Sequence, residues 1–256
     1  MIIAVINNKG GTAKTTTSVN LAAGLARSGE KTLLVDLDSQ ASASLSLGVQ
    51  NQDLTPSMSE ALLEGRPMEE IIRSSAQPGL DMAVGSMDLA NTDLHLADVS
   101  GRERRLMRQL HRVRTDYAWI VLDCPPSLSM LSINALVAAD FYLIPVKPEY
   151  LSLQGLFNLD LAIKRLKRGM NLAPRLAGIL LTIVHPCSRV VRQNINEIRK
   201  HYAEDVFETY IRQDVRLLEA PAHGQSIFSY SPSSSGARAY SRIVEDMKAR
   251  IKRAET

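Results

Sequence analysis

Cysteine is scarce in this chain, with only Cys124 and Cys187 among 256 residues. Two distant cysteines cannot form a disulfide framework, and without a Cys-x-x-Cys spacing they do not indicate a zinc or iron–sulfur site within one chain. Long apolar runs are lacking too, because the stretch from Leu176 to Val184 is far shorter than the roughly 20 residues that span a bilayer. The N-terminus has no charged start or cleavage site of a signal peptide. The sequence therefore predicts a soluble, cytoplasmic protein.

The chain also lacks a strong excess of charge of either sign, since its formal net charge is +3. Such a small value does not by itself indicate a nucleic-acid partner, so the distribution of the charge matters more. Basic residues gather in five short segments, namely residues 102–114, 164–168, 189–200, 212–216 and 248–253. Solvated helix faces account for most segments of this kind. They become informative only beside a second indication of what the protein binds.

Apolar runs of strand length alternate with longer segments of helical period. The expected buried strands are Ile2–Ile6, Thr32–Asp36, Ala118–Asp123, Phe141–Val146 and Ala177–Val184. The expected helices are Lys14–Arg27, Met130–Ala139, Ser152–Lys167, Arg189–Tyr202 and Ala237–Arg253. This alternation predicts an α/β fold with one doubly wound, mainly parallel sheet and helices on both faces. No linker divides the chain, so we expect residues 1–256 to form a single domain without an N-terminal helix-turn-helix extension.

A glycine-containing turn joins the first predicted strand to the first predicted helix. Backbone N–H groups in such a turn converge on a phosphate, and the positive end of the helix dipole adds to them. The ordinary P-loop pattern fails, because Asn8 and Ala13 stand where its two glycines should be. Lys14 would contact the β- and γ-phosphates, and the Thr15 hydroxyl would ligate Mg²⁺. The predicted phosphate-binding residues are Lys9, Gly10, Gly11, Thr12, Ala13, Lys14, Thr15 and Thr16.

Carboxylates follow two further strands at the edge of the sheet where parallel α/β folds bind their ligands. The segment LLVDLDSQ ends the second strand with Asp36 and Asp38, which can hold the Mg²⁺ shell and orient an attacking water. The segment WIVLDCPPS delivers Asp123 to a strand end in the manner of a Walker B motif. The predicted metal-site residues are therefore Thr15, Asp38 and Asp123. A phosphate loop and two such strand ends together predict a nucleotide-hydrolysing enzyme.

These motifs resemble the ParA/Soj/MinD family of ATPases with a deviant Walker A motif, and more specifically its ParA/Soj partition branch. The resemblance covers nearly the whole chain, in KGGTAKTTTSVNLA, LLVDLDSQASAS, DCPPSLSMLSINAL, PVKPEYLSLQGL, GILLTIV and DVRLLEAPAHGQSIFSYSPSSSGARAY. It implies ATP and Mg²⁺ as cofactors and a homodimer that forms on ATP binding. It further implies non-specific binding of double-stranded DNA, and a ParB-like partner that stimulates a slow hydrolysis.

The resemblance also assigns roles to single residues. Lys9 would reach the ATP of the partner subunit, as an arginine finger supplied in trans does. Lys14 would hold the phosphates in cis and Asp38 would position the hydrolytic water. Asp123 would support Mg²⁺ indirectly, through a water bound to the metal. Asp214 matches a position that contacts adenine. Arg216 matches an arginine implicated in DNA binding. In the loop from His185 to Arg192, which differs from the family's usual pattern, Arg189 and Arg192 could take over the cationic role.

Three departures from the family pattern affect these expectations. Ala13 replaces the usual glycine before Lys14, and because a left-handed alanine costs about 1 kcal/mol or more, we expect a negative φ at this residue. Ser39 replaces a proline. The tripeptide Arg212-Gln213-Asp214 replaces Pro-Arg-Asn, so the adenine contacts are less certain than the phosphate contacts.

Other functions fit the sequence less well. A MinD-like membrane cycle would need an amphipathic C-terminal helix rich in large apolar residues, whereas the stripe Ile243, Val244, Met247 and Ile251 is better suited to packing on the sheet. The nitrogenase iron protein needs two cysteines at its dimer interface, which Cys124 and Cys187 do not supply. A metal site at His185 and Cys187 has no third ligand nearby in sequence. We therefore predict a cytoplasmic, nucleoid-associated partition ATPase without stable membrane association; its cargo (chromosome, plasmid, carboxysome or other) stays open.

Overall fold

The computed structural model of the chain describes residues 1–255 and contains one seven-stranded sheet with the strand order β3-β4-β2-β5-β1-β6-β7. Every neighbouring pair of strands is parallel except β3 and β4, which are antiparallel. The strands are β1 (Ile2–Val5), β2 (Thr32–Asp36), β3 (Ile72–Ser74), β4 (Leu80–Ala83), β5 (Trp119–Asp123), β6 (Phe141–Val146) and β7 (Arg175–Leu181). The expected doubly wound, mainly parallel sheet is confirmed.

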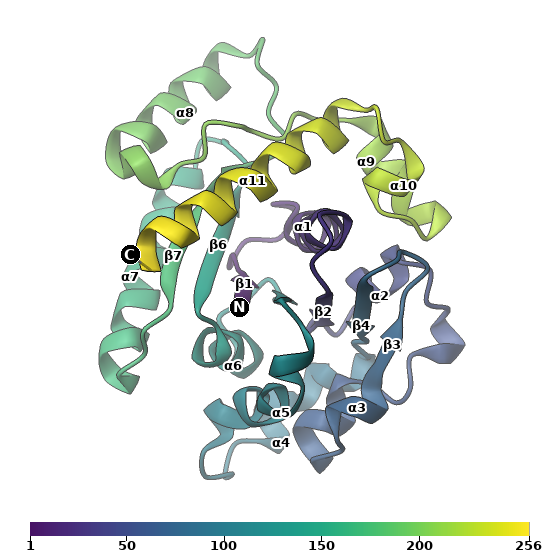
Figure 1. Cartoon of the computed structure of the whole chain (residues 1–256). Coiled ribbons are helices and arrows are strands. Elements are labelled where there is room, and N and C mark those ends of the chain that lie inside the picture. The colour runs from purple at the N-terminus through teal and green to yellow at the C-terminus, as the bar shows by residue number, and fades with distance from the viewer. Residues whose placement is uncertain (256) are drawn as a thin grey trace.

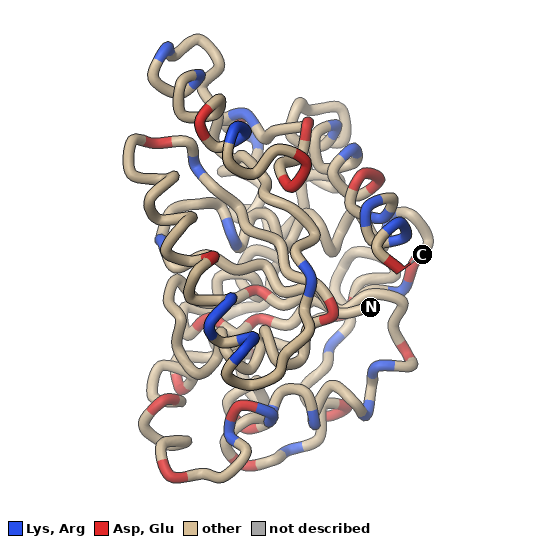
Figure 2. The backbone as a smooth tube through the Cα atoms, turned by 90° about the vertical axis from the view of Figure 1, so that its left-hand side faces the viewer, with Lys and Arg blue, Asp and Glu red and all other residues tan. Residues whose placement is uncertain are grey.

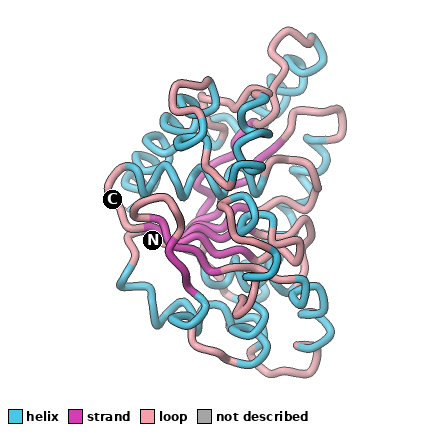
Figure 3. Tube along the Cα trace, turned by 90° about the vertical axis from the view of Figure 1, so that its right-hand side faces the viewer, coloured by secondary structure: helices cyan, strands magenta, loops and turns pink. Residues whose placement is uncertain are grey.

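Helices cover both faces of this sheet (Figure 1), and Figure 3 shows the strands between them from another side. The α-helices are α1 (Lys14–Arg27), α2 (Ser42–Ser46), α3 (Met68–Ile71), α4 (Thr92–His95), α5 (Arg105–Val113), α6 (Met130–Ala138), α7 (Ser152–Met170), α8 (Arg189–Tyr202), α9 (Val215–Glu219), α10 (Ile227–Tyr230) and α11 (Ser235–Glu255). The five expected helices correspond to α1, α6, α7, α8 and α11, with ends that differ by at most three residues.

The alternation of side chains along the strands divides the apolar core into two layers. On β1, Ile3 and Val5 face a layer formed with α1, α10 and α11, whereas Ile2 and Ala4 face a layer formed with α3, α5, α6 and α7. Because both faces are covered, the central strands β1, β2, β5 and β6 are buried at every position and show no polar alternation. The two layers hold the sheet rigidly, so that its carboxyl edge can position the loops that follow each strand.

The C-terminal helix α11 uses its apolar stripe inside the protein. Ile243, Val244, Met247 and Ile251 are all buried in the layer that contains α1. The prediction that this stripe packs on the sheet is confirmed. In the described part of the chain, 1–255, no helix combines the length and apolar character that crossing a bilayer requires.

Candidate functional site

The phosphate loop runs from the end of β1 to the start of α1, at the carboxyl edge of the sheet. Its backbone is left-handed at Gly11 (φ 69°) and again at Ala13 (φ 59°). A Cβ atom placed on Gly10 or on Gly11 would meet no other atom within 4 Å, so open space faces both glycines. Residues of alternating left- and right-handed backbone turn successive N–H groups to one side, which is how backbone nests bind anions. The loop therefore fits a phosphate group.

The expected negative φ at Ala13 is wrong. Ala13 is the N-cap residue of α1, with φ 59° and ψ 36°, and its carbonyl accepts the first helical hydrogen bond, from the Thr17 amide, at 2.9 Å. The chain enters α1 from the loop through this left-handed turn, so the geometry that glycine usually supplies is kept with alanine. The strain costs about 1–2 kcal/mol, which contacts elsewhere in the folded chain must outweigh.

The two lysines of the loop lie in different surroundings. Lys14 is buried, its ammonium donates a hydrogen bond to the Lys9 carbonyl at 3.1 Å, and burial lowers its pKa. The side chain of Lys9 is 45% exposed and forms an ion pair with Glu149 at 3.3 Å. Glu149 is also paired with Lys147. Lys14 is thus directed into the phosphate loop, whereas Lys9 lies at the surface.

Strand pairing brings two of the carboxylates together, because Asp36 on β2 and Asp123 on β5 are direct partners in the parallel register. Both side chains are fully buried. Asp36 accepts hydrogen bonds from the Ser44 amide (2.9 Å), the Ser44 hydroxyl (2.8 Å) and the Asp38 amide (3.1 Å). Asp36 therefore anchors the segment that carries Asp38. Asp38 itself is half-buried, and among residues 1–255 its carboxylate accepts one hydrogen bond, from the Gln40 amide.

Asp123 has one satisfied and one unsatisfied oxygen. Oδ1 accepts a hydrogen bond of 2.7 Å from the Ser18 hydroxyl, whereas Oδ2 is buried without a hydrogen-bond partner among the described residues. A buried, unpaired carboxylate oxygen is costly unless a cation or its water completes it. Mg²⁺ keeps several waters and binds through few protein oxygens plus substrate phosphates. Thr15 and Asp123 fit this mode of binding, and the metal would supply charge neutralisation at the phosphates.

Burial and the neighbouring carboxylate raise the pKa of Asp123 to about 7, and burial raises that of Asp36 to about 6. The folded protein therefore binds more protons than the unfolded chain between pH 4 and 7, so these two groups make the free energy of unfolding fall as pH rises through this range. A bound cation would stabilise the ionised pair. The site thus stores unfavourable electrostatic energy that a bound Mg²⁺ would relieve.

The Asp123→Asn variant tests this electrostatic strain. This variant removes one of the two buried charges. Without nucleotide, the melting temperature of the wild type should fall between pH 5.5 and pH 8, and that of the variant should fall by about 5 °C less. Thermal unfolding followed by circular dichroism at the two pH values measures this difference. The control is Asp98→Asn, the same substitution at an exposed position, and its melting temperature should depend on pH as that of the wild type does. A wild-type pH dependence in Asp123→Asn would contradict the assignment.

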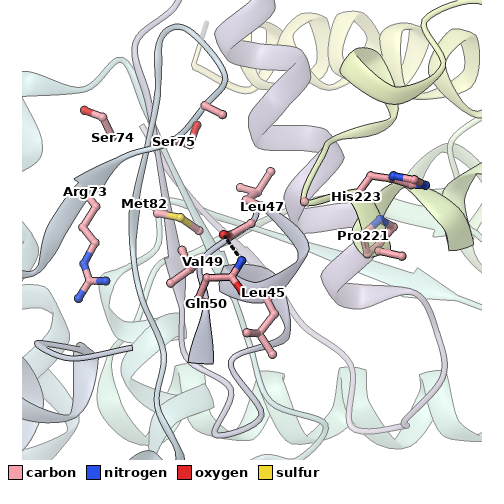
Figure 4. A pocket seen from close by; sticks show the side chains of 14 residues that line it. Leu45, Leu47, Val49, Gln50, Arg73, Ser74, Ser75, Met82, Pro221 and His223 are labelled. Carbon is pink, nitrogen blue, oxygen red and sulfur yellow. Dashed lines mark hydrogen bonds between the residues drawn. The ribbon is translucent and has the colours of Figure 1, made fainter. Parts of the chain in front are cut away.

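Two cavities help to locate the ligand site. A cavity of about 390 Å³ opens beside Asp38 and is walled by Gln40, Asp93, Pro125 and Ser127, among others, so a ligand has access to the Asp38 carboxylate. A second cavity, of about 540 Å³, lies between the residues that follow α2 and the 220–224 segment (Figure 4). None of the predicted site residues lines the second cavity, which is therefore not the phosphate site.

The remaining predicted site residues lie away from the loop. Arg189 and Arg192 are exposed on α8, and Arg216 is exposed on α9. Asp214 is the N-cap residue of α9, and its carboxylate accepts hydrogen bonds from the Arg216 amide, the Ser235 hydroxyl and the Gly236 amide. Asp214 thus ties α9 to the start of α11. Its predicted adenine contact stays a prediction.

The sequence reasoning missed two side chains that the site uses. Ser18 lies one helical turn after Lys14 and holds Asp123 in place, and this i, i+4 spacing on a helix that faces the sheet is a signal that could have revealed it. Glu149, which pairs with Lys9 across 140 positions, had no such signal, because only the fold brings the two together.

The sequence matches the family model described as an AAA domain over residues 1–176. It is 39% identical to the sporulation initiation inhibitor protein Soj of Bacillus subtilis, over 97% of this chain and 98% of that protein. It is 38% identical to the chromosome-partitioning ATPase Soj of Thermus thermophilus, over 98% of this chain and 97% of that protein.

Solved structures share the fold. Cobyrinic acid a,c-diamide synthase from Mycobacterium smegmatis, with bound ADP and magnesium, aligns with a TM-score of 0.85 and 28% identity over 98% of this chain and 95% of that one. The cell division ATPase MinD of Pyrococcus furiosus aligns with a TM-score of 0.79 over 97% and 98%; at 24% identity this likeness shows the fold alone. From the loop geometry and these matches, the chain belongs to the ParA/Soj/MinD family of P-loop ATPases, on its ParA/Soj branch, whose cofactors are ATP and Mg²⁺.

Proposed function

We propose that this protein is a partition ATPase in which MgATP drives formation of a sandwich dimer that binds DNA without sequence preference. A ParB-like partner then stimulates a slow hydrolysis and releases the subunits, so that chromosome, plasmid or other cargo is segregated. The protein would work in the cytoplasm as one ATPase domain and associate with the nucleoid in its ATP state. The names of several relatives, the chromosome-partitioning Soj and ParA proteins, support this proposal.

The position of Lys9 carries the proposal. Lys14 already supplies a buried cation inside the loop, so the subunit has no need of a second lysine for its own phosphates. Lys9 instead extends from the same loop to the surface, where a weak, exposed pair with Glu149 holds it. When a second subunit docks, Lys9 can leave Glu149 at little cost and contact the phosphates of the nucleotide that the second subunit holds. A surface cation on a phosphate loop therefore favours a dimer that is completed by ATP.

Basic residues on α8 and α9, two helices in the upper part of Figure 1, would supply the DNA-binding surface. In Figure 2 basic positions follow the uppermost helical segment. Arg189, Arg192 and Arg216 are exposed, and no acidic side chain forms an ion pair with them among residues 1–255. Each phosphate contact releases counterions, so a dimer doubles the contacts and steepens the salt dependence. ATP-dependent dimerisation would in this way control the affinity for DNA.

The MinD-like membrane cycle is the weaker alternative. The apolar residues of α11 that could insert into a lipid surface are buried against the sheet, and the last turns expose Lys252, Arg253 and Glu255. A helix that binds at an interface needs a free apolar face beside its cations. The buried stripe therefore favours DNA over lipid as the polyanion that the protein recognises.

Fluorescence anisotropy of a random-sequence duplex, with MgATP or MgADP at several salt concentrations, tests the proposal. We expect tight, steeply salt-dependent binding with MgATP only. In Arg216→Ala the binding should weaken, and the slope of log K against log salt should fall by about 2 per dimer, because each subunit loses about one phosphate contact.

Arg112→Ala is the matched control, since Arg112 is also exposed but lies on α5, at the opposite end of the fold in Figure 1. It should bind DNA as the wild type does. An equal loss in both variants, or loss of the dimer itself in Arg216→Ala, would refute the assigned DNA-binding role. Absence of DNA binding in both nucleotide states would refute the DNA-binding part of the proposal and lead to a test with anionic vesicles.

A further inference from the structure

The chain leaves β7 next to the phosphate loop. Thr182, the first residue after this strand, is fully buried, and its hydroxyl donates a hydrogen bond to the Thr12 carbonyl at 3.0 Å. The Thr182 amide donates in turn to the Val146 carbonyl of β6 at 2.9 Å. A side chain fixed to the sheet thus holds the backbone of the phosphate loop across 170 positions of sequence.

The Thr12 carbonyl depends on this hydrogen bond. Because Ala13 is left-handed, the α1 ladder begins at the Ala13 carbonyl and leaves the Thr12 carbonyl outside it. Thr12 is only 3% exposed, and no backbone N–H among residues 1–255 donates to its carbonyl. A buried carbonyl must find a donor inside the protein. The Thr182 hydroxyl supplies that donor, so the left-handed turn at Ala13 and the Thr182 bond stabilise each other.

The backbone after Thr182 shows that the surrounding structure fixes the place of this residue. Ile183 has φ 52°, a conformation that is strongly disfavoured for a β-branched residue. A hydrogen bond on the C-terminal side of Ile183 holds this conformation, since the Val184 amide donates to the Ile211 carbonyl at 3.0 Å. Strain of this kind persists where the surrounding structure determines the geometry, and it concentrates at functional sites. Here the strained turn ends the strand at the residue that contacts the phosphate loop.

We propose that Thr182 is a positioning residue for nucleotide binding. Its hydroxyl holds the Thr12 carbonyl and so keeps Ala13 in the left-handed conformation that directs the loop amides toward the phosphates. A glycine at position 13 would reach this conformation without strain, whereas alanine needs the external hydrogen bond to stay there. The unusual alanine in the loop and the buried threonine after β7 therefore act as one unit.

Thr182→Val removes the hydroxyl and keeps the shape of the side chain. We expect the affinity for ATP and for ADP, measured with a fluorescent analogue in the absence of DNA or partner, to fall about tenfold in each case, which corresponds to one lost buried hydrogen bond. Thr182→Ser, which retains the donor, should bind both nucleotides as the wild type does. The proposal is overturned if Thr182→Val binds nucleotide with wild-type affinity. It is also overturned if Thr182→Ser loses as much affinity as Thr182→Val does.

Two further variants separate positioning from stability. Thr32→Val removes a buried threonine hydroxyl that donates to the Glu30 carbonyl at 2.8 Å at the opposite edge of the sheet, so it should lower the melting temperature and leave nucleotide affinity unchanged. In the Ala13→Gly background, Thr182→Val should cost less than threefold in affinity, because glycine keeps the turn unaided. If Thr32→Val weakens ATP equally, or if Ala13→Gly leaves the tenfold loss intact, Thr182 has only a structural role. None of these measurements requires the dimer or DNA, so their outcome is independent of the proposed function.

Discussion

Replacing Lys14 with alanine should weaken ATP binding by about 100-fold or more. Its ammonium is buried in the loop and bonded to a backbone carbonyl, so it is already desolvated and oriented before nucleotide arrives. Removing such a group leaves the phosphate charge without a partner in a poorly solvated site, which typically costs 2–5 kcal/mol. Isothermal titration of the variant with MgATP and MgADP measures this loss.

Lys9→Ala is the matched comparison, because it removes a lysine from the same loop that lies at the surface. We expect this variant to bind nucleotide within about threefold of the wild type, since the Glu149 pair that it breaks is exposed and weak. It should, however, fail to form the ATP-dependent dimer in sedimentation experiments. Unaltered ATP affinity in Lys14→Ala would refute the phosphate-loop assignment, and a wild-type dimer and hydrolysis rate in Lys9→Ala would show that Lys9 does not act in trans.

Much of the fold could be predicted because buried parallel strands are continuously apolar. Thr32–Asp36 and Phe141–Val146 were predicted with the observed bounds for this reason. The edge strand β3 and its neighbour β4 were missed, because three and four residues without an apolar run do not differ from a loop in sequence. Their pairing depends on contacts with β2 and with each other that only the assembled sheet provides. The end of the last strand was placed at Val184 and lies at Leu181, since the left-handed backbone of Ile183 turns the chain out of the sheet.

The site was predictable where chemistry is carried by strand ends and by the loop itself. The positions of Lys14 and Asp123 follow from the βα connections in which they stand. The prediction of a negative φ at Ala13 is wrong for a physical reason. It rests only on a local steric preference of about 1 kcal/mol, whereas a hydrogen bond from Thr182, 169 positions away, holds the turn. Propensity indicates what a residue prefers in isolation, and tertiary contacts can outweigh it.

Asp38→Ala should lower the rate of ATP hydrolysis by about 100-fold or more while ATP binding is retained. The structure separates the two carboxylates of the LLVDLD segment: Asp36 uses both oxygens to anchor Ser44 and the Asp38 amide, so it cannot take part in the reaction without unfolding the segment. Asp38 has free acceptor capacity and faces a cavity of about 390 Å³. A carboxylate that accepts a proton from water or orients it typically contributes 10²- to 10⁴-fold to a rate.

Phosphate release under saturating MgATP measures the Asp38→Ala effect, and sedimentation in the same buffer should show an ATP-bound dimer that no longer dissociates. Ser39→Ala is the control at the neighbouring position and should hydrolyse ATP within about threefold of the wild type. Normal turnover in Asp38→Ala would remove Asp38 from the mechanism. A loss of hydrolysis together with a loss of ATP binding would instead place Asp38 in the phosphate and metal site, where its negative charge would serve Mg²⁺ and not the attacking water.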